Sequence, residues 1–444
     1  MAASRPDVPG RCAPERPVPR NREPIVDAAW SIRALGLFVL GYPIIMSAVW
    51  VVGGLYYFFR REHGQSPVEE PPPLRDPPPV TVLVPCHNEG DNVRETVGAL
   101  LEQRYPLLEI IAINDGSTDD TGALLDALAA ENPSVRVLHL GTNQGKAVAL
   151  RMGAVAARSE YLVCVDGDAI LDEYAVHWMV FHLVGGPRVG AVTGNPRIRN
   201  RSTLLGRLQV GEFSSIIGMI KRAQRTYGRL FTVSGVVCAF RRTALHRVGY
   251  WSDSIVTEDI DISWRLQMDH WDVRYEPRVL CSILMPETLG GLWRQRLRWA
   301  KGGAQTAVAH SPGLRTWRRR RMWPVLGEYL VSVAWAYSVL ALVLLIGLGA
   351  MIPVPGWFRL DVLHPSWTTV ALATVCMVQF GVSLIIDRRY EPGVGRHLYW
   401  MIWYPLAYWL IGLTTTVVAV TVTLVGRGRP NTRAVWTSPD RGVR

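Results

Sequence analysis

The sequence predicts an α/β domain, with helices on both faces of a mostly parallel sheet, inserted between membrane-spanning α-helices. Uncharged apolar runs lie near both ends of the chain, and β-rich runs alternate with helix-like segments between them. The chain has 444 residues, of which 49% are hydrophobic, and its mean hydropathy is +0.12. These values are too high for a water-soluble enzyme of this size, and they exclude a disordered or collagen-like chain.

Four apolar runs without a charged residue account for the hydropathy, and each can span a bilayer, which requires roughly 20 residues. The predicted transmembrane helices are residues 34–59, 329–352, 366–386 and 398–425. Residues 1–33, rich in Arg and Pro, are expected to be a disordered tail without signal-peptide features, and residues 426–444 form a second tail. The Pro-rich residues 60–79 are predicted to be a linker, because Pro disfavours helix and central strand.

The alternation of strand-like and helix-like segments predicts one α/β domain over residues 80–288. The β-rich runs are residues 80–84, 110–113, 135–140, 161–165 and 189–192, and the helix-like segments include residues 92–101, 118–130 and 147–157. Strands that alternate with helices pair in parallel, and such sheets bind ligands outside the carboxyl ends of their strands. We therefore expect the functional site at residues that directly follow these strands.

Polar residues follow three of the predicted strands. Pro85 and Glu89 follow the first, Asp115 follows the second, and Asp166 and Asp168 follow the fourth. Two carboxylates one residue apart can face one hard cation, and Mg²⁺ or Mn²⁺ held in this way completes its shell with water and phosphate oxygens. The alternative for the Asp-x-Asp pattern is an acidic turn after a buried strand, and for Asp115 it is an ordinary Asp-Gly turn.

Two predicted helix starts carry further charged candidates. Lys146 opens a helix whose N-terminal amides favour anions, so it is either a phosphate contact or a solvated charge. Thr257 is expected to cap a helix that runs to Met268, with Glu258 and Asp259 in its first turn. Asp259 is either a general base or an acid that stabilises the helix dipole.

Residues 289–328 form an Arg- and Trp-rich amphipathic segment that we expect on the bilayer surface. Gln295, Arg298 and Trp299 share one helical face in it. They offer an amide, a guanidinium that can grip a pyrophosphate, and an indole on which a sugar can stack; the alternative is an interfacial helix with an aromatic anchor. The five Arg between positions 315 and 321 place this end, and the α/β domain with it, in the cytoplasm.

The order of the motifs along the chain favours the functional interpretation of each. An aspartate after the second strand, Asp-x-Asp, Thr-Glu-Asp and Gln-x-x-Arg-Trp follow one another and lead directly into membrane spans. In this pattern the chain resembles the processive family 2 glycosyltransferases. Within that family, the similarity to bacterial synthases of poly-β-1,6-N-acetyl-D-glucosamine is carried by residues 194–199, 210–218, 249–253 and 436–442. The match starts near Val39. Before that residue the chain differs from the family, which usually has a further span where residues 1–28 stand.

The resemblance implies a GT-A fold, a Rossmann-like nucleotide-sugar domain that transfers N-acetylglucosamine from UDP-N-acetylglucosamine with inversion. By motif, the residues that would bind the donor are Pro85, Glu89, Asp115, Lys146, Asp166, Gln295 and Arg298. Asp168 would hold Mg²⁺ or Mn²⁺, and Asp259 would be the catalytic base. The residues that would bind the acceptor are Trp299, Ser234, Gly235 and Glu258.

The resemblance also implies partners and a location. A growing polysaccharide would leave through the protein's own spans in the bacterial inner membrane, for a biofilm matrix. Beside the lipid bilayer, the implied partners are a small membrane accessory subunit and cyclic di-GMP, without nucleic acid. A synthase of hyaluronan, chitin or cellulose is the nearer alternative, because no residue that we can identify fixes the linkage. A basic module for nucleic acid or lipid would interleave Arg and aromatics across the α/β domain, whereas the Arg runs lie beside the spans.

The predicted topology conflicts with the charge of the two tails. One span before a cytoplasmic domain and three spans after it put both termini outside. Yet six Arg lie at or before Arg33, and five follow Val425, which the positive-inside rule would keep in the cytoplasm. Residues 398–425 are long for a single span, so we expect their first part to lie along the interface.

Overall fold

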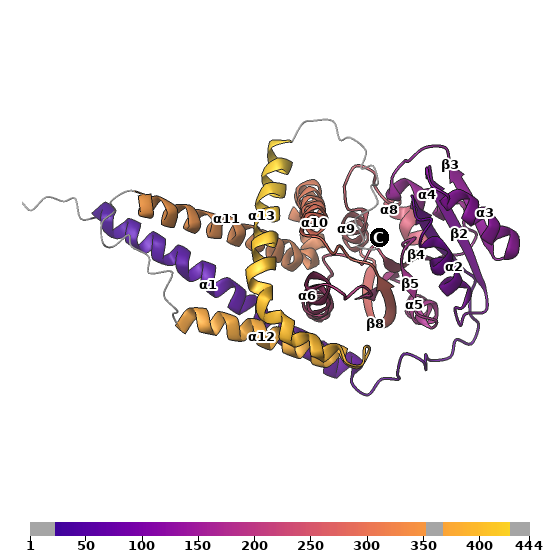
Figure 1. The fold of residues 1–444 in the computed structure, drawn as a ribbon, viewed down its shortest axis with the longest axis horizontal. Helices are drawn as coiled ribbons and strands as arrows, with labels where there is room; N and C mark the ends of the chain where they lie inside the picture. The colour runs from indigo at the N-terminus through magenta and orange to yellow at the C-terminus, as the bar shows by residue number, and fades with distance from the viewer. Residues whose placement is uncertain (1–22, 352–366, 427–444) are drawn as a thin grey trace, which may run out of the picture.

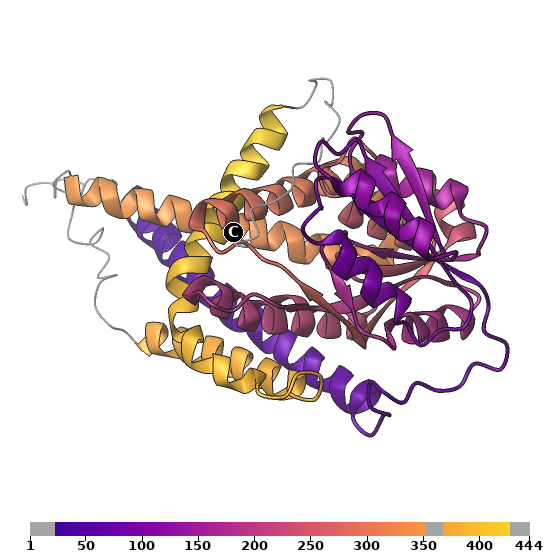
Figure 2. The ribbon, with the colours of Figure 1, turned by 45° about the vertical axis from the view of Figure 1, so that its right-hand side comes forward.

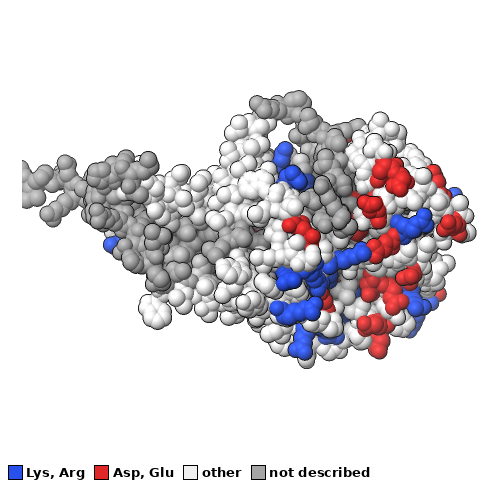
Figure 3. Space-filling model, viewed as in Figure 1, with Lys and Arg blue, Asp and Glu red and all other residues white. Residues whose placement is uncertain are grey.

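The computed structural model describes residues 23–351 and 367–426. It consists of an α/β domain and a group of long helices that leave one side of it (Figure 1). On the face shown in Figure 3, acidic side chains gather over the α/β domain. The part of the helical region that is not drawn in grey carries almost no charge. This division into a charged domain and an uncharged helical part agrees with the hydropathy of the sequence.

One mixed sheet organises the α/β domain. In the described residues it has eight strands in the order β3-β2-β1-β4-β7-β6-β8-β5. Their bounds are β1 Val80–Cys86, β2 Leu108–Asp115, β3 Val135–Leu140, β4 Tyr161–Val165, β5 Ile170–Leu171, β6 Val189–Ile198, β7 Val237–Arg241 and β8 Asp272–Ile283. The expected parallel pairing is found for β1 with β2 and β4, for β2 with β3, and for β6 with β8. β7 runs antiparallel between β4 and β6, and β5 pairs antiparallel with β8, so the sheet is less parallel than the sequence predicts.

Helices cover both faces of this sheet, because successive side chains of the central strands point to opposite faces and both sets are apolar. Val82 and Ile110 belong to the hydrophobic core on one face, and Leu83 and Ile111 to the core on the other. The helices of the domain are α2 Val93–Leu101, α3 Thr121–Glu131, α4 Lys146–Ala156, α5 Ala175–Val184, α6 Leu204–Glu212, α7 Ile220–Tyr227, α8 Arg242–Val248 and α9 Glu258–Met268, with the π-helix η2 Phe213–Met219 between α6 and α7.

Three of the described helices are long and apolar enough to cross a membrane. They are α1 Glu23–Tyr57, which continues as the π-helical turn η1 Phe58–Glu62, α11 Trp323–Met351 and α12 Trp367–Asp387. α1 begins earlier than predicted, so residues 23–33 are helical and not a disordered tail; residues 1–22 lie outside the described residues. α1 packs against both α11 and α12, which makes the three helices one bundle.

The fourth apolar run differs from a single spanning helix. It folds as the 3-10 helix η6 Val394–Trp403 followed by α13 Tyr404–Val425. α13 runs across the direction of α1, α11 and α12 in both ribbon views (Figures 1 and 2) and packs against α10 Leu289–His310. Thus α10 lies between α13 and the α/β domain (Figure 1).

A buried ionic network fixes the helix bundle to the α/β domain. Arg222 of α7 is 0% exposed, and its Nε lies 2.7 Å from Oε1 of Glu62, at the end of η1. Its Nη2 lies 3.1 Å from Oδ1 of Asp387, the last residue of α12, which Arg197 of β6 also contacts at 2.7 Å. The ends of α1 and α12 are therefore held at one place on the domain.

Candidate active site

The ends of β1, β2 and β4 form the first part of the candidate site. Asp115 accepts hydrogen bonds from the backbone N–H groups of Gln144 and Gly145, at 2.7 and 2.8 Å, so the loop before α4 closes over the end of β2. Gly116 makes this closure possible: its φ is +61°, and a Cβ there would lie 2.4 Å from the carbonyl carbon of Thr142. Asp115 itself is completely buried.

The Asp-Gly-Asp turn after β4 packs directly on the loop after β1. A Cβ on Gly167 would lie 3.1 Å from Cγ of Glu89 and 3.2 Å from the carbonyl oxygen of Pro85. The structure thus brings Pro85, Glu89, Asp115 and Asp166 to one edge of the sheet, as the strand ends predict.

Asp166 and Asp168 fit a divalent cation that shares its shell with a substrate. Burial raises the pKa of the Cys281 thiol, and the negative charges of Asp166 and Asp168 raise it further, so both carboxylates lie near that side chain. No group of three or more His, Cys, Asp or Glu in the described residues could hold a metal ion without other ligands. A pair of carboxylates that leaves positions open for phosphate oxygens is the arrangement that Mg²⁺ and Mn²⁺ accept.

Lys146 connects the turn after β4, which carries Asp166, to the start of α9. Its Nζ lies 2.5 Å from Oδ1 of Asp166 and 3.3 Å from Oε1 of Glu258, and it donates a hydrogen bond of 3.2 Å to the carbonyl oxygen of Gly235. Burial disfavours the ammonium charge, but Asp166 and Glu258 outweigh burial and raise the pKa of Lys146 above its ordinary value. The side chain is therefore a permanent cation between the two carboxylates, and not the solvated charge of the simpler interpretation.

Asp259 lies in the first turn of α9, on the other side of Gly235. The backbone N–H of Gly235 donates to Oδ2 of Asp259 at 3.3 Å. Burial and then the neighbouring Glu258 raise the pKa of Asp259 to about 6, against the opposing effect of Lys146 and Arg298. Thr257 is the N-cap residue as predicted, but its side chain makes no capping hydrogen bond. An aspartate whose pKa is near neutrality can accept a proton near the operating pH, so Asp259 is suited to the role of general base.

The predicted acceptor segment contains a lysine contact that the motifs did not indicate. Nζ of Lys221 lies 2.5 Å from Oγ of Ser234 and 3.3 Å from Oγ1 of Thr193. Burial lowers the pKa of Lys221 to about 7, although Asp259 opposes this effect. The rarity of lysine, with three in the chain, was the signal in the sequence that could have indicated it.

The Gln-x-x-Arg-Trp motif lies on α10, and it includes a second arginine that sequence reasoning passed over. Trp299 packs against the core of the sheet, whereas Arg298 is exposed and close enough to Asp259 to affect its pKa. The buried Arg296 forms an ion pair of 2.6 Å with Glu212 of α6, and its Cζ lies 4.3 Å from the centre of the Trp299 ring. Gln295 has a buried Oε1 with no hydrogen-bond partner in the described part of the chain.

The fold and the site together define the class of the protein: a nucleotide-sugar glycosyltransferase domain joined to membrane helices. The solved structure of mannosyltransferase PcManGT from Pyrobaculum calidifontis, in complex with GDP-Man and Mn²⁺, aligns with a TM-score of 0.57 at 20% identity. The alignment covers 87% of this chain and 99% of that chain, which confirms the predicted GT-A fold.

The sequence comparison identifies the family. Residues 77–302 match glycosyltransferase-like family 2, and the chain belongs to this family. It is 37% identical over 410 residues to a poly-β-1,6-N-acetyl-D-glucosamine synthase of Staphylococcus epidermidis, covering 91% of this chain and 98% of the relative. A synthase with the same name from Staphylococcus aureus strain MSSA476 is 38% identical over 406 residues, with the same coverage. The resemblance seen in the motifs and the assignment as a glycosyltransferase are both confirmed.

Proposed function

We propose that this protein polymerises N-acetylglucosamine from UDP-N-acetylglucosamine into poly-β-1,6-N-acetyl-D-glucosamine and exports the chain through its own spans for a biofilm matrix. The names of its relatives, which align over 91% of the chain, support the choice of sugar and linkage. The observation that carries the proposed reaction is the position of Gly235, whose carbonyl contacts Lys146 and whose N–H contacts Asp259. A donor phosphate and an acceptor hydroxyl can thus be held on neighbouring groups.

In the proposed reaction Asp259 accepts the proton of the acceptor hydroxyl. The hydroxyl oxygen then forms a bond to the anomeric carbon of the donor while the bond from that carbon to the UDP oxygen breaks on the opposite face. Displacement on an α-linked donor gives a β-linked product. Lys146 and Arg298 would stabilise the negative charge that develops on the leaving diphosphate. Ser234 and Trp299 would position the acceptor chain, and Asp115 would fix the loop that encloses the uridine.

A divalent metal is part of this proposal. Asp168, with Asp166 beside it, would hold Mg²⁺ or Mn²⁺, which supplies positive charge to the donor diphosphate when bound. A cation held by one or two carboxylates has further coordination positions for phosphate oxygens, and the PcManGT structure is a complex with Mn²⁺. We also propose a small membrane accessory subunit and activation by cyclic di-GMP; both rest on the family resemblance.

The donor is tested with the purified full-length protein in lipid nanodiscs. UDP release and radiolabelled polymer are measured with UDP-N-acetylglucosamine, UDP-glucose and UDP-glucuronate, singly and in pairs. We expect polymer with UDP-N-acetylglucosamine alone. A requirement for added UDP-glucuronate would indicate a hyaluronan synthase, and activity with UDP-glucose alone would indicate a cellulose synthase.

We further propose that the protein lies in the bacterial inner membrane with three spans and with the catalytic domain and the C-terminus in the cytoplasm. Because Arg222 contacts both Glu62 and Asp387, α1 and α12 end on the side of the catalytic domain. α13, which runs across the bundle, would then lie along the cytoplasmic surface (Figures 1 and 2). This places the five Arg after Val425 on the side that the positive-inside rule favours.

A reporter fusion distinguishes this topology from the four-span alternative. Alkaline phosphatase, which is active only outside the cytoplasm, is joined after Arg444, and green fluorescent protein is joined at the same position as the converse reporter. We expect an inactive phosphatase and a fluorescent fusion. An active phosphatase would mean that α13 crosses the membrane.

A further inference from the structure

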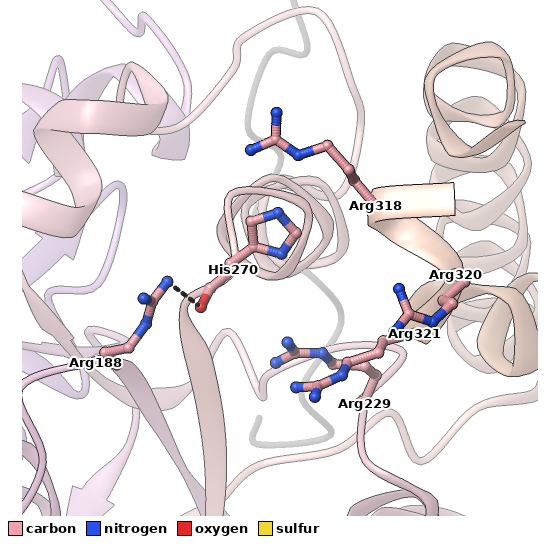
Figure 4. A pocket seen from close by; sticks show the side chains of 6 residues that line it. All are labelled: Arg188, Arg229, His270, Arg318, Arg320 and Arg321. Atoms are coloured by element: carbon pink, nitrogen blue, oxygen red, sulfur yellow. Dashed lines mark hydrogen bonds between the residues drawn. The ribbon is translucent and has the colours of Figure 1, made fainter. Parts of the chain in front are cut away.

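Five arginines and one histidine line a cavity of about 550 Å³ between the catalytic domain and the start of α11 (Figure 4). Arg188 directly precedes β6, Arg229 follows α7, and His270 lies in the turn between α9 and β8. The other three, Arg318, Arg320 and Arg321, belong to the 3-10 helix η4 Trp317–Met322. The cavity has the size of an ordinary small-ligand site, and both the domain and the membrane-proximal segment contribute to it.

The positive charge of this cavity is only partly offset by neighbouring acids, of which Asp272 acts on Arg229. In the described residues, none of its five arginines has a carboxylate within ion-pair distance. The two acids nearest in sequence are engaged elsewhere: Asp272 with Arg225 at 2.9 Å, and Asp269 with Arg247 at 2.6 Å. An anion in the cavity would therefore relieve repulsion between guanidinium groups that form no ion pair in the described part of the chain.

Arg229 is a buried residue among those that line the cavity. Its side chain is 7% exposed, and Nη1 donates a hydrogen bond of 3.0 Å to the carbonyl oxygen of Trp271. Burial, together with nearby arginines that include Arg321 and Arg188, lowers the pKa of Arg229 from its ordinary value, although Asp272 opposes this effect. A guanidinium held by a carbonyl and surrounded by other cations lacks the anion that it binds best.

The cavity is separate from the catalytic centre and adjacent to the membrane. Asp166 follows the carboxyl end of β4, whereas Arg188 precedes the amino end of β6, and these two strands run in the same direction because each is antiparallel to β7. The two sites thus lie at opposite ends of the sheet. Trp317, which is 68% exposed, opens η4, and the spanning helix α11 begins at Trp323. Exposed indoles at such a position are typical of the lipid headgroup region.

We propose that this arginine cavity binds the phosphate group of an anionic ligand, and that the bound phosphate links the catalytic domain to the membrane-proximal helix η4. A planar guanidinium pairs with two phosphate oxygens at once, and several arginines from two segments can surround one phosphate. A phospholipid headgroup or a soluble phosphate would supply this chemistry. The assignment does not depend on which polysaccharide the enzyme makes.

Ligand-dependent thermal stability of the detergent-solubilised full-length protein tests this site without requiring catalysis. The ligands are inorganic phosphate, with chloride at equal ionic strength as the control for screening, and dihexanoyl phosphatidylglycerol, with dihexanoyl phosphatidylcholine as the control for the lipid tails. The double variant R318Q/R321Q removes two exposed lining arginines, and R315Q removes an exposed arginine of the same segment that does not line the cavity.

We expect the midpoint of unfolding to rise with one of the two phosphate ligands in the wild type and in R315Q. The R318Q/R321Q variant should need at least about tenfold more ligand for the same rise, because each lost charged hydrogen bond typically weakens binding by that factor or more. A rise with inorganic phosphate identifies a soluble ligand, and a rise with phosphatidylglycerol alone identifies a lipid headgroup. No rise in the wild type with either ligand, or an equal response of R318Q/R321Q, would overturn the proposal.

Discussion

Replacement of Asp259 by Asn tests the proposed general base. The amide has the shape of the carboxyl group and can still accept the hydrogen bond from the N–H of Gly235, so the donor site should remain formed. It cannot take a proton from the acceptor. Removal of a general base typically lowers the rate by about 10² to 10⁴-fold. We expect a loss of UDP release in this range, with binding of UDP-N-acetylglucosamine almost unchanged.

The pH dependence follows from the pKa of about 6 of Asp259. Only the deprotonated carboxylate can act as a base, so the wild-type rate should fall about tenfold for each pH unit below 6 and level off above it. The residual activity of D259N should lack this dependence on pH.

The same carboxylate should reduce the stability of the folded protein above neutral pH. Its pKa is raised from 3.8 to about 6, so folding favours the neutral form, and this stabilisation, present below pH 3.8, is lost as the pH rises through 6. The difference corresponds to at most about 3 kcal/mol, and partial exposure of the side chain reduces it. D259N should therefore unfold at a higher temperature than the wild type at pH 8, with no such difference at pH 3.5.

The assay is UDP release in nanodiscs between pH 5 and pH 9, beside thermal unfolding of the same samples. D269N is the matched control, because Asp269 lies at the opposite end of α9, where it pairs with Arg247. Wild-type activity in D259N, or an unchanged pH profile, would refute the assignment of Asp259 as the base.

Three further substitutions test other parts of the site and the fold. D168A should raise the metal concentration for half-maximal UDP release at least tenfold; an unchanged metal dependence would assign the metal to other residues. D115A leaves the amides of the loop before α4 without their acceptor, so the KM for the donor should rise about tenfold with a smaller change in kcat, and an unchanged KM would contradict the role of this loop. R222M leaves the buried Glu62 without its arginine and leaves Asp387 with Arg197 alone, so it should destabilise the protein by about 3–5 kcal/mol in thermal unfolding. The control R199M breaks an exposed ion pair and should cost no more than about 1 kcal/mol; equal effects of the two would show that burial does not govern the network.

Much of the first half of the sheet could be predicted from the sequence, because strands buried on both faces appear as short apolar runs. β1, for example, is buried at every position. β8 was harder to recognise, because Glu276 and Arg278 interrupt its apolar pattern; in the fold they pair with each other at 2.7 Å inside the protein. The direction of α13 could not be predicted either, since hydropathy reports the length of an apolar segment but not its packing against α10.

Motif order located the candidate catalytic residues but not their partners. Asp115, Asp166 and Asp259 stand at strand and helix ends that local patterns reveal. The contact between Arg222 and Glu62 joins residues 160 positions apart, which leaves no local signal in a single sequence. The ion pair of Arg296 with Glu212 likewise depends on how α10 packs against α6.

Linkage analysis of the product is the most direct test of the proposed function. Polymer made from radiolabelled UDP-N-acetylglucosamine by the purified protein is digested in parallel with a β-1,6-specific hexosaminidase, a chitinase and a hyaluronidase, with the D259N sample as the background. We predict complete release of label by the hexosaminidase and none by the other two enzymes. A polymer that resists the hexosaminidase and is cleaved by chitinase or hyaluronidase would contradict the proposed function.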